Sequence, residues 1–312
     1  PRVAETAKTL WLIYASLTLL CAFAYWLAGM SPFDAITHSF STVSIGGFST
    51  HDSSMAYFNS PAVNLITVAF LLISACNYAL HFNAFSNLGK RNIFVSYFRD
   101  PEFRFFMFIQ IALVTVCFFM LLTNHHFDET FKNLEQAAFQ SVSISTTAGY
   151  TTSSFDQWPL FLPILLLFAS FIGGCAGSTG GGLKVIRILV LSLQGKRELK
   201  RLIHPNLVYP IKLGKHVLDE RVIQSIWAFF SAYLLVFVVC LLGVISCGVE
   251  TFDAFNAVIA CLNNLGPGLG SVSSNFVSVP DSAKWILTLT MVCGRLEIFS
   301  LLVLFTPAFW KS

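Results

Sequence analysis

The stretch Ser44-Ile45-Gly46-Gly47-Phe48-Ser49-Thr50 decides the fold of this chain, because related stretches recur twice further along. The second is Thr146-Thr147-Ala148-Gly149-Tyr150-Thr151-Thr152, and the third is Asn263-Asn264-Leu265-Gly266-Pro267-Gly268. Each one follows roughly 10–15 residues of helix-compatible sequence, which is too short to cross a membrane. Long apolar segments flank each copy. The repeated unit is therefore a helix, a short re-entrant helix with a glycine loop, and a second helix.

The composition places these units in a membrane. The chain has 312 residues, of which 55% are hydrophobic and 11% charged, and its mean hydropathy is +0.70. Soluble domains carry about 25% charged residues, so a soluble enzyme, a disordered chain and a nucleic-acid-binding domain are all disfavoured. Uncharged apolar runs of about 20 residues predict spanning helices. We expect six, at residues 10–30, 61–85, 105–123, 158–183, 222–249 and 285–310.

The repeats divide the chain into three units, residues 1–90, 91–195 and 222–312, with a basic linker at 196–221. Each short segment starts with a Phe-Asp pair, namely Phe33-Asp34, Phe127-Asp128 and Phe252-Asp253. The Asp precedes the glycine by 13 residues in the first and third units and by 21 in the second, which predicts an insertion there. We align the units on their glycines. An alignment of residues 40–45 with 139–144 remains possible.

Charge asymmetry predicts the orientation. With the glycine loops outside, the outer side holds two of the 19 basic residues, Lys132 and Lys284, and nine of the 16 acidic residues. Basic residues gather on the cytoplasmic side of membrane proteins. The glycine loops are therefore predicted to face the outside.

Three glycine loops at membrane depth predict a cation pore. Irregular backbone is tolerated in a membrane only where protein buries it or where it lines a watery cavity. Glycine allows positive φ angles, which turn carbonyl groups toward one axis, and rings of carbonyls replace the hydration shell of K⁺. Plain packing is an alternative explanation for a single loop, whereas three in register favour a pore. The predicted filter residues are Ile45, Gly46, Gly47, Thr147, Ala148, Gly149, Asn264, Leu265 and Gly266.

A carbonyl filter of this type needs four strands, and the chain offers three. We therefore expect a fourth unit before Pro1, and expect the chain to be part of a longer protein. The third loop lacks the hydroxyl residues of the second, and none of the loops has the full Thr-Val-Gly-Tyr-Gly pattern. These departures predict looser selectivity for potassium over sodium.

A separate glycine-rich stretch interrupts the fourth predicted span at residues 173–182. Each glycine costs a helix about 1 kcal/mol relative to alanine, so an irregular loop is expected here. Close packing between helices is an alternative explanation. A phosphate-binding loop is disfavoured, because Leu183 separates Lys184 from the last glycine.

Arg295 lies near the middle of the sixth predicted span, where a charge costs at least about 2.5–3.5 kcal/mol. It either pairs with a carboxylate on another helix or forms an electrostatic barrier beside the permeation path. Both roles are compatible with one another.

Together these motifs resemble the bacterial Trk/Ktr/HKT family of potassium transporters. The resemblance is carried by residues 44–50, 173–184, Gly294-Arg295-Leu296-Glu297 and 305–310. It implies an all-α integral membrane protein with repeated M1–pore helix–M2 units around a pseudo-fourfold, potassium-channel-like pore. The three units of this chain match the second to fourth of the four repeats in that family.

The resemblance also implies a function: potassium uptake across the bacterial inner membrane, with filter loops facing the periplasm. K⁺ is the transported ion, and no organic cofactor is expected in this chain. The glycine-rich loop lies below the filter as a gate, and the gate residues are Gly173, Gly174, Gly177, Gly180, Gly181, Gly182, Lys184 and Arg295. The implied partners are a second copy of the chain, a cytosolic nucleotide-binding regulatory subunit on the basic inner face, and membrane lipid, but no nucleic acid.

Two other classes of protein compete with this interpretation. A secondary transporter of an organic solute would have inverted repeats and several polar groups at the membrane midplane, whereas these repeats are parallel. An intramembrane enzyme would need a catalytic pair, and none stands out in the sequence, so we expect no enzyme. The sequence leaves open whether the ion moves alone or is coupled to protons or sodium.

Overall fold

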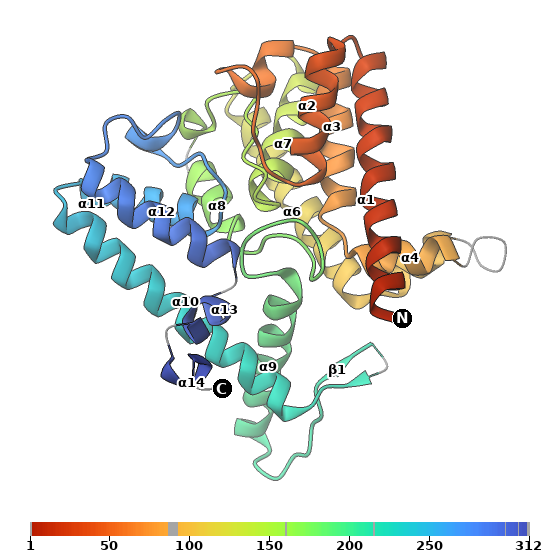
Figure 1. Ribbon diagram of the computed structural model, residues 1–312, viewed down its shortest axis with the longest axis vertical. Coiled ribbons are helices and arrows are strands. Elements are labelled where there is room, and N and C mark those ends of the chain that lie inside the picture. Colours follow the sequence, from red (N-terminus) through yellow and green to blue (C-terminus); the bar gives the residue numbers. More distant parts are fainter. Residues whose placement is uncertain are drawn as a thin grey trace.

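The structure is a computed structural model that describes residues 2–86, 93–159, 161–214, 216–296, 298–304 and 306–310. Helices dominate it, and a short β-hairpin projects from one end (Figure 1). The three predicted units follow one another along the chain. Their long helices enclose the glycine loops, which lie toward the middle of the molecule (Figure 1).

The first unit contains one long helix, one short re-entrant helix and a broken second helix. Its elements are α1 (Arg2–Leu27), α2 (Pro32–Val43), η1 (Ser54–Phe58), α3 (Pro61–Ser74) and α4 (Tyr78–Ser86). The short helix α2 begins where Ser31 accepts a hydrogen bond from the Asp34 backbone amide. Pro32 occupies its first turn, where the missing amide hydrogen does no harm. These residues fix the start of the re-entrant helix.

The second unit repeats this order with a longer re-entrant helix. Its elements are α5 (Ile93–Arg99), α6 (Pro101–Thr123), α7 (Thr130–Ser145), η2 (Phe155–Gln157), α8 (Leu162–Ala169) and α9 (Val185–Ile203). The predicted insertion is confirmed: α7 has 16 residues, against 12 in α2.

The third unit follows the hairpin of β1 (Lys212–Leu213) and β2 (His216–Val217), whose strands pair antiparallel with Lys212 opposite Val217. Its elements are α10 (Glu220–Ser246), α11 (Thr251–Leu262), η3 (Gly270–Val272), α12 (Asp281–Arg295), α13 (Ile298–Leu304) and α14 (Pro307–Trp310). The short helices α2, α7 and α11 are the three predicted re-entrant helices, so that prediction is confirmed.

The predicted interruption of the fourth span is present, and the second and sixth predicted spans are also divided. By length and composition, the described helices able to cross a membrane are Ala7–Leu27, Pro101–Thr123 and Glu220–Ser246. The bent pair Pro61–Ser74 and Tyr78–Ala84, with an angle of 91° between its halves, would make a fourth. The fourth predicted span is divided into α8 and α9, and the sixth into α12, α13 and α14.

The bend in the second span has a physical cause that lies far along the sequence. The Cys175 amide donates to the Ala75 carbonyl at 2.8 Å, and the Tyr78 amide donates to the Gly177 carbonyl at 3.3 Å. The glycine-rich loop thus satisfies backbone groups that a continuous helix would pair internally. From its local sequence alone, the segment of residues 61–85 is predicted to be one continuous helix.

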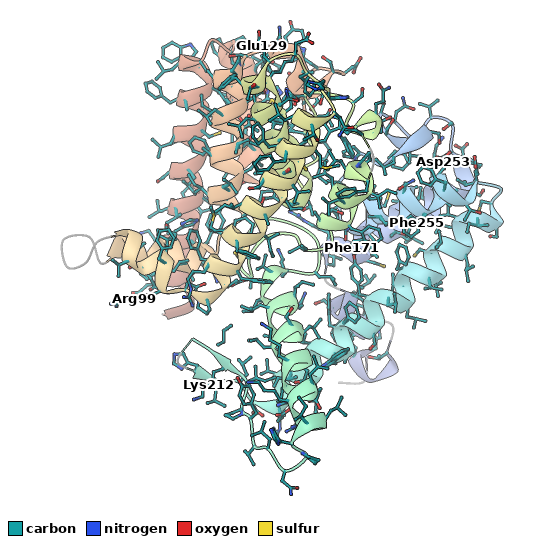
Figure 2. All side chains as sticks on the ribbon, turned by 180° about the vertical axis from the view of Figure 1, so that it is seen from behind. Arg99, Glu129, Phe171, Lys212, Asp253 and Phe255 are labelled. Atoms are coloured by element: carbon teal, nitrogen blue, oxygen red, sulfur yellow. The ribbon has the colours of Figure 1, made fainter. Side chains whose placement is uncertain are left out.

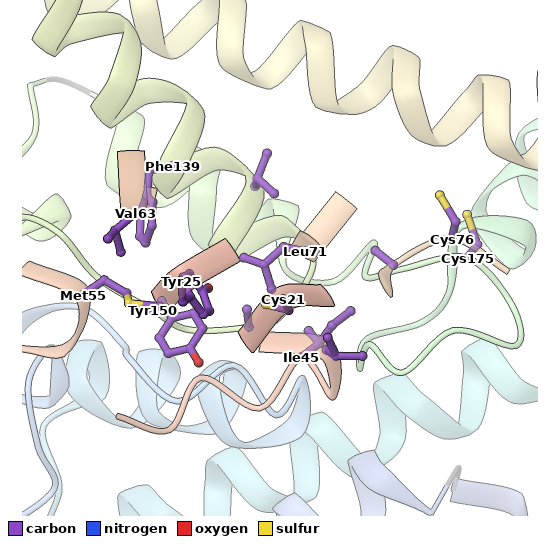
Figure 3. Close-up of a cluster of buried hydrophobic side chains, with 14 of the residues drawn as sticks. Cys21, Tyr25, Ile45, Met55, Val63, Leu71, Cys76, Phe139, Tyr150 and Cys175 are labelled. Carbon is purple, nitrogen blue, oxygen red and sulfur yellow. The ribbon is translucent and has the colours of Figure 1, made fainter. Parts of the chain in front are cut away.

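The first two units share one buried core. Tyr25 from α1, Leu71 from α3, Phe139 from α7 and Tyr150 are all fully buried in it, and Figure 3 shows these side chains gathered between the helices. By contrast, large apolar side chains on the outer faces of α1 and α10 are exposed, as expected for helices that face lipid tails.

Two acidic and two basic side chains mark opposite ends of the molecule. Glu129 and Asp253 lie toward one end, whereas Arg99 and Lys212 lie toward the other (Figure 2). The structure therefore keeps apart the acidic and basic groups that the sequence assigned to opposite sides of the membrane.

Candidate functional site: glycine loops and a loop beneath them

The three glycine loops have the same backbone conformation. Each glycine has a positive φ, and so does the residue two positions before it. The φ values are 53° and 69° at Ile45 and Gly47, 68° and 82° at Thr147 and Gly149, and 56° and 96° at Asn264 and Gly266. Positive φ is uncommon for residues with a side chain, so its threefold recurrence identifies one repeated turn.

The same hydrogen bond closes each turn onto its short helix. The amides of Gly46, Ala148 and Leu265 donate to the carbonyls five residues earlier, at 2.7, 2.8 and 2.8 Å. The alignment of the units on their glycines is therefore correct, and the alignment of residues 40–45 with 139–144 is wrong.

The Phe-Asp pair of the second unit is not the counterpart of the other two. In the first unit, Asp34 accepts a hydrogen bond from the Thr50 hydroxyl at 2.7 Å. The equivalent bond in the second unit runs from Thr152 to Gln136, also at 2.7 Å. Gln136 precedes its glycine by 13 residues, as Asp34 does. The insertion therefore lies before Gln136, and Asp128 stands outside the repeat.

The third unit makes a related contact, in which Asp253 accepts hydrogen bonds from the Ser271 amide and hydroxyl. Each of these three contacts joins the N-terminal part of a short helix to the chain that leaves its glycine turn. The Ser31 hydroxyl also donates a hydrogen bond to the Asp34 carboxylate, and this bond is the largest cause that lowers the pKa of that carboxyl. The hydrogen bond from Thr50 and the nearby histidines lower the same pKa further.

The loops pack against one another around a common centre. A Cβ on Gly47 would lie 1.8 Å from the Ala148 carbonyl oxygen, and one on Gly149 would lie 1.9 Å from the Leu265 oxygen. Each glycine therefore receives a carbonyl of the next loop where a side chain would otherwise be. Beside Gly266 no atom of the described residues lies within 4 Å of where a Cβ would be. Among the described residues, the ring formed by the three loops is therefore open at this point.

A cavity of about 480 Å³ lies on the side of the three turns that faces away from the glycine-rich loop. Gly47, Gly149 and Gly266 all contribute to its lining, together with the carboxylates of Asp52 and Asp156. Negative charge in a cleft raises the local concentration of cations. The structure thus brings together the glycines of all three predicted filter segments at one acidic mouth.

The glycine-rich loop lies directly beneath the turns and contacts all three. The Thr179 hydroxyl donates to the Val43 carbonyl at 2.9 Å, and the Gly181 amide donates to the Thr147 hydroxyl at 2.7 Å. A Cβ on Gly181 would lie 2.3 Å from the Asn263 carbonyl oxygen. The loop therefore meets the C-terminal end of each short helix.

The loop is also attached at its sides. The Ala176 amide donates to the Glu102 carboxylate at 2.6 Å, and the Lys184 ammonium donates to the Gly180 and Ser178 carbonyls. Sequence reasoning missed Glu102, because an acidic residue in the first turn of a helix is ordinary. Its burial, with 6% of its surface exposed, is what distinguishes it.

A second cavity, of about 340 Å³, lies on the side of the loop that faces away from the turns. Gly177, Gly180, Tyr233 and Arg295 are among its lining residues. The Arg295 guanidinium donates to the Thr179 carbonyl at 3.2 Å, so it contacts the loop itself. Glu297, the other charged residue of that motif, lies outside the described residues.

A buried chain of hydroxyl groups joins the first two units behind their turns. Tyr25 shares hydrogen bonds with Thr42 at 2.8 Å and Thr67 at 2.9 Å, and Thr42 donates to Tyr150 at 3.3 Å. Figure 3 shows Tyr25 and Tyr150 close together in the core. No sequence pattern indicates this network, because its members come from four separate segments.

This geometry defines a class: a membrane protein with re-entrant pore loops, in which glycine turns and a further loop beneath them separate two cavities. The chain belongs to the TrkH family, described as cation transport protein, whose pattern matches residues 1–312. The predicted all-α fold with repeated pore-helix units is thereby confirmed.

The similar proteins are named as transporters and not as enzymes. The chain is 64% identical to the Trk system potassium uptake protein TrkH of Vibrio parahaemolyticus and 60% identical to that of Escherichia coli, each over all 312 residues. The crystal structure of the potassium transporter TrkH from Vibrio parahaemolyticus has a TM-score of 0.95 at 63% identity, covering 100% of this chain and 66% of that one. The chain spans 64% of the length of both sequence relatives.

Proposed function

We propose that this chain forms three quarters of a potassium pore, and that its protein takes up potassium across the bacterial inner membrane. The observation that carries the proposal is the single backbone turn repeated at Gly47, Gly149 and Gly266, beneath an acidic mouth. The names of the related proteins support potassium as the transported ion.

In the proposed mechanism, the carbonyl oxygens of the three turns replace the water around a dehydrated K⁺ ion. They belong to Ile45, Gly46, Gly47, Thr147, Ala148, Gly149, Asn264, Leu265 and Gly266. Below them lie the C-terminal ends of α2, α7 and α11, where the helix dipole carries partial negative charge. That charge favours a cation leaving the turns on the inner side.

The glycine-rich loop of residues 173–182 acts as the gate in this proposal. It crosses between the two cavities, and Arg295 contributes a positive charge below it while donating to Thr179. Movement of the loop away from Val43 and Thr147 would open the path. The glycines allow that movement at small steric cost, while Lys184 and Glu102 hold its two flanks.

A pore of fourfold pseudosymmetry requires a fourth turn beside Gly266, whose neighbourhood is open among the described residues. We propose that this turn is supplied from outside the 312 residues. The acidic mouth then faces the periplasm, in agreement with the gathering of basic residues at the other end. A second copy of the chain, a cytosolic nucleotide-binding subunit and membrane lipid are the proposed partners.

The test is radioactive rubidium uptake into proteoliposomes that contain the full-length protein. We expect external potassium, but not sodium, to compete for uptake. Gly149→Asp should abolish uptake, because any side chain there meets the Leu265 carbonyl.

Gly248→Asp is the matched control, since Gly248 also has a positive φ of 89° but has open space around it among the described residues. Equal competition by sodium would contradict potassium selectivity. Normal uptake by a correctly folded Gly149→Asp protein would remove these loops from the permeation path.

A further inference from the structure

A groove lies on the basic end of the molecule, away from the filter and the gate. It has a volume of about 400 Å³ and runs between α9 and the segment that leads into β1. Its lining includes three ammonium groups, those of Lys196, Lys200 and Lys212, and the apolar or aromatic side chains of Leu193, Ile211 and Tyr209. The groove therefore has a positively charged part and an apolar part.

The groove presents positive charge without a matching negative charge. None of its described lining residues is a carboxylate. The neighbouring Arg197 differs, because it forms a bidentate ion pair with Glu220 and contacts Glu198. Lys200 lies over the ring of Tyr209, 4.1 Å from its centroid. Three ammonium groups around one groove repel each other, and an anion between them would relieve that repulsion.

The groove lies at the level where the helices leave the membrane. The apolar part of α10 begins directly after Arg221, and Glu220 pairs with Arg197 of α9. Because a helix rises 1.5 Å per residue, Lys196 and Lys200 lie within about 5 Å of this level along α9. That is the depth of phospholipid headgroups, where lysine side chains extend toward phosphate.

Apolar surface continues from the groove along α9. Leu199, which also lines the groove, is 64% exposed, and Leu202, one turn further, is 80% exposed. A small inorganic anion would leave the apolar wall at Leu193 uncovered. An anion that carries a hydrocarbon chain would contact the lysines and cover that wall.

We propose that this groove binds the headgroup of an anionic phospholipid. The phosphate lies among Lys196, Lys200 and Lys212, and an acyl chain follows the apolar wall toward Leu193. This lipid would belong to the inner leaflet, an assignment that rests on the proposed orientation of the protein. The chemistry of the bound lipid does not depend on which ion the pore carries. A binding measurement therefore tests it separately from transport.

The experiment uses the full-length protein in a neutral detergent, with phosphatidylglycerol or phosphatidylcholine added as mixed micelles. Bound lipid is counted by native mass spectrometry, and the midpoint of thermal unfolding is recorded. We expect phosphatidylglycerol to bind and to raise the midpoint by about 2–4 °C, while phosphatidylcholine does neither. The triple variant Lys196→Gln/Lys200→Gln/Lys212→Gln should bind phosphatidylglycerol about tenfold or more weakly.

Arg99→Gln/Arg104→Gln/Arg201→Gln is the control, because it removes the same charge from the basic end without touching the groove. Should the triple variant not fold, Lys196→Gln and Lys212→Gln serve singly, since both side chains are exposed, and each should weaken binding in part.

Several results would overturn the proposal. Equal binding of phosphatidylcholine, or equal loss in the control variant, would show general lipid or charge effects. An equal midpoint shift with inorganic phosphate alone would make the groove a site for a free anion. Unchanged lipid binding in the groove variant, together with a lower mass in light scattering, would assign the groove to contact with a second copy.

Discussion

The first two glycine loops and the third reach the same backbone turn with different side chains around it. The turns at Gly47 and Gly149 are joined by buried hydroxyl groups, from Tyr25 through Thr42 to Tyr150. The helix before the third turn instead buries an almost wholly apolar run, from Ala257 to Leu262. Pro267 follows its glycine where Tyr150 stands in the second unit.

The comparison separates what the turn requires from what merely surrounds it. The constant features are a glycine with positive φ, a positive φ two residues earlier and the hydrogen bond back to the short helix. The buried side chains that hold the turn differ between the units: Tyr25, Thr42 and Tyr150 beside the first two, and Tyr233 and Ser170, which bond Asn263, beside the third. Selectivity should therefore depend most on the constant features and least on the surroundings.

The largest expected effect is at the constant glycines. Gly47→Ala and Gly149→Ala each place a Cβ within 2 Å of a neighbouring carbonyl oxygen. Overpacking costs about 1–3 kcal/mol, and the left-handed backbone adds about 1–2 kcal/mol for alanine. Rubidium uptake should fall about 30-fold or more, with Gly248→Ala as the control. Retention of more than half the wild-type rate would contradict the close approach of the loops.

Gly266→Ala sharpens the comparison, because its surroundings within the described residues are open. If these residues were the whole pore, the variant would suffer from backbone strain alone, about 1–2 kcal/mol or roughly tenfold in rate. We expect the full-length protein to lose as much uptake as Gly149→Ala does, because a fourth turn occupies that space. A clearly milder loss in the same uptake assay would contradict the fourth turn.

A smaller effect is expected where the gate loop meets the first unit. Thr179→Val removes the hydroxyl that donates to the Val43 carbonyl while keeping the shape of the side chain. A hydrogen bond contributes about 0.5–1.5 kcal/mol, so unstimulated rubidium uptake should rise about two- to tenfold. Thr288→Val is the control, because that exposed hydroxyl bonds within its own helix. Reduced or unchanged uptake would contradict a closing role for this contact.

The smallest effect is expected in the surroundings of the second turn. Tyr150→Phe removes one hydroxyl from the buried chain and should lower the free energy of unfolding by about 1 kcal/mol. The preference for rubidium over sodium should change little, because the third turn adopts the same backbone conformation with other buried contacts, in which Tyr233 donates to Asn263 and Asn263 donates to Ser170. Denaturation and competition assays measure the two quantities, with the exposed Tyr57→Phe as the control. A large loss of selectivity would show that the network fixes the turn itself.

Much of this architecture could be predicted from residue patterns. The glycine spacing predicted the three short helices and their turns, and the interruption at residues 173–182 predicted a loop. The predictable parts are local: a helix too short to span, and glycine where backbone must bend. Even the counterpart of Asp34 was within reach, since Gln136 stands at the same distance from its glycine.

The parts that escaped prediction depend on contacts between distant segments. The bend between α3 and α4 needs backbone groups of Cys175 and Gly177, about a hundred residues later. Positive φ at Ile45 and Thr147 has no signature in residue type, whereas asparagine, as at position 264, adopts it more readily. The burial of Glu102 is likewise set by the loop it holds. No periodicity in one segment encodes such pairs.

In the proposed gating mechanism, the hydrogen bonds that hold the glycine-rich loop set a minimum free energy for opening it. Those at Val43, Thr147 and Arg295 alone amount to about 1.5–4.5 kcal/mol in total. A regulator can shift an equilibrium only by the difference in its affinity for the two states. Any opener must therefore bind the open form roughly 10- to 2,000-fold more tightly than the closed one.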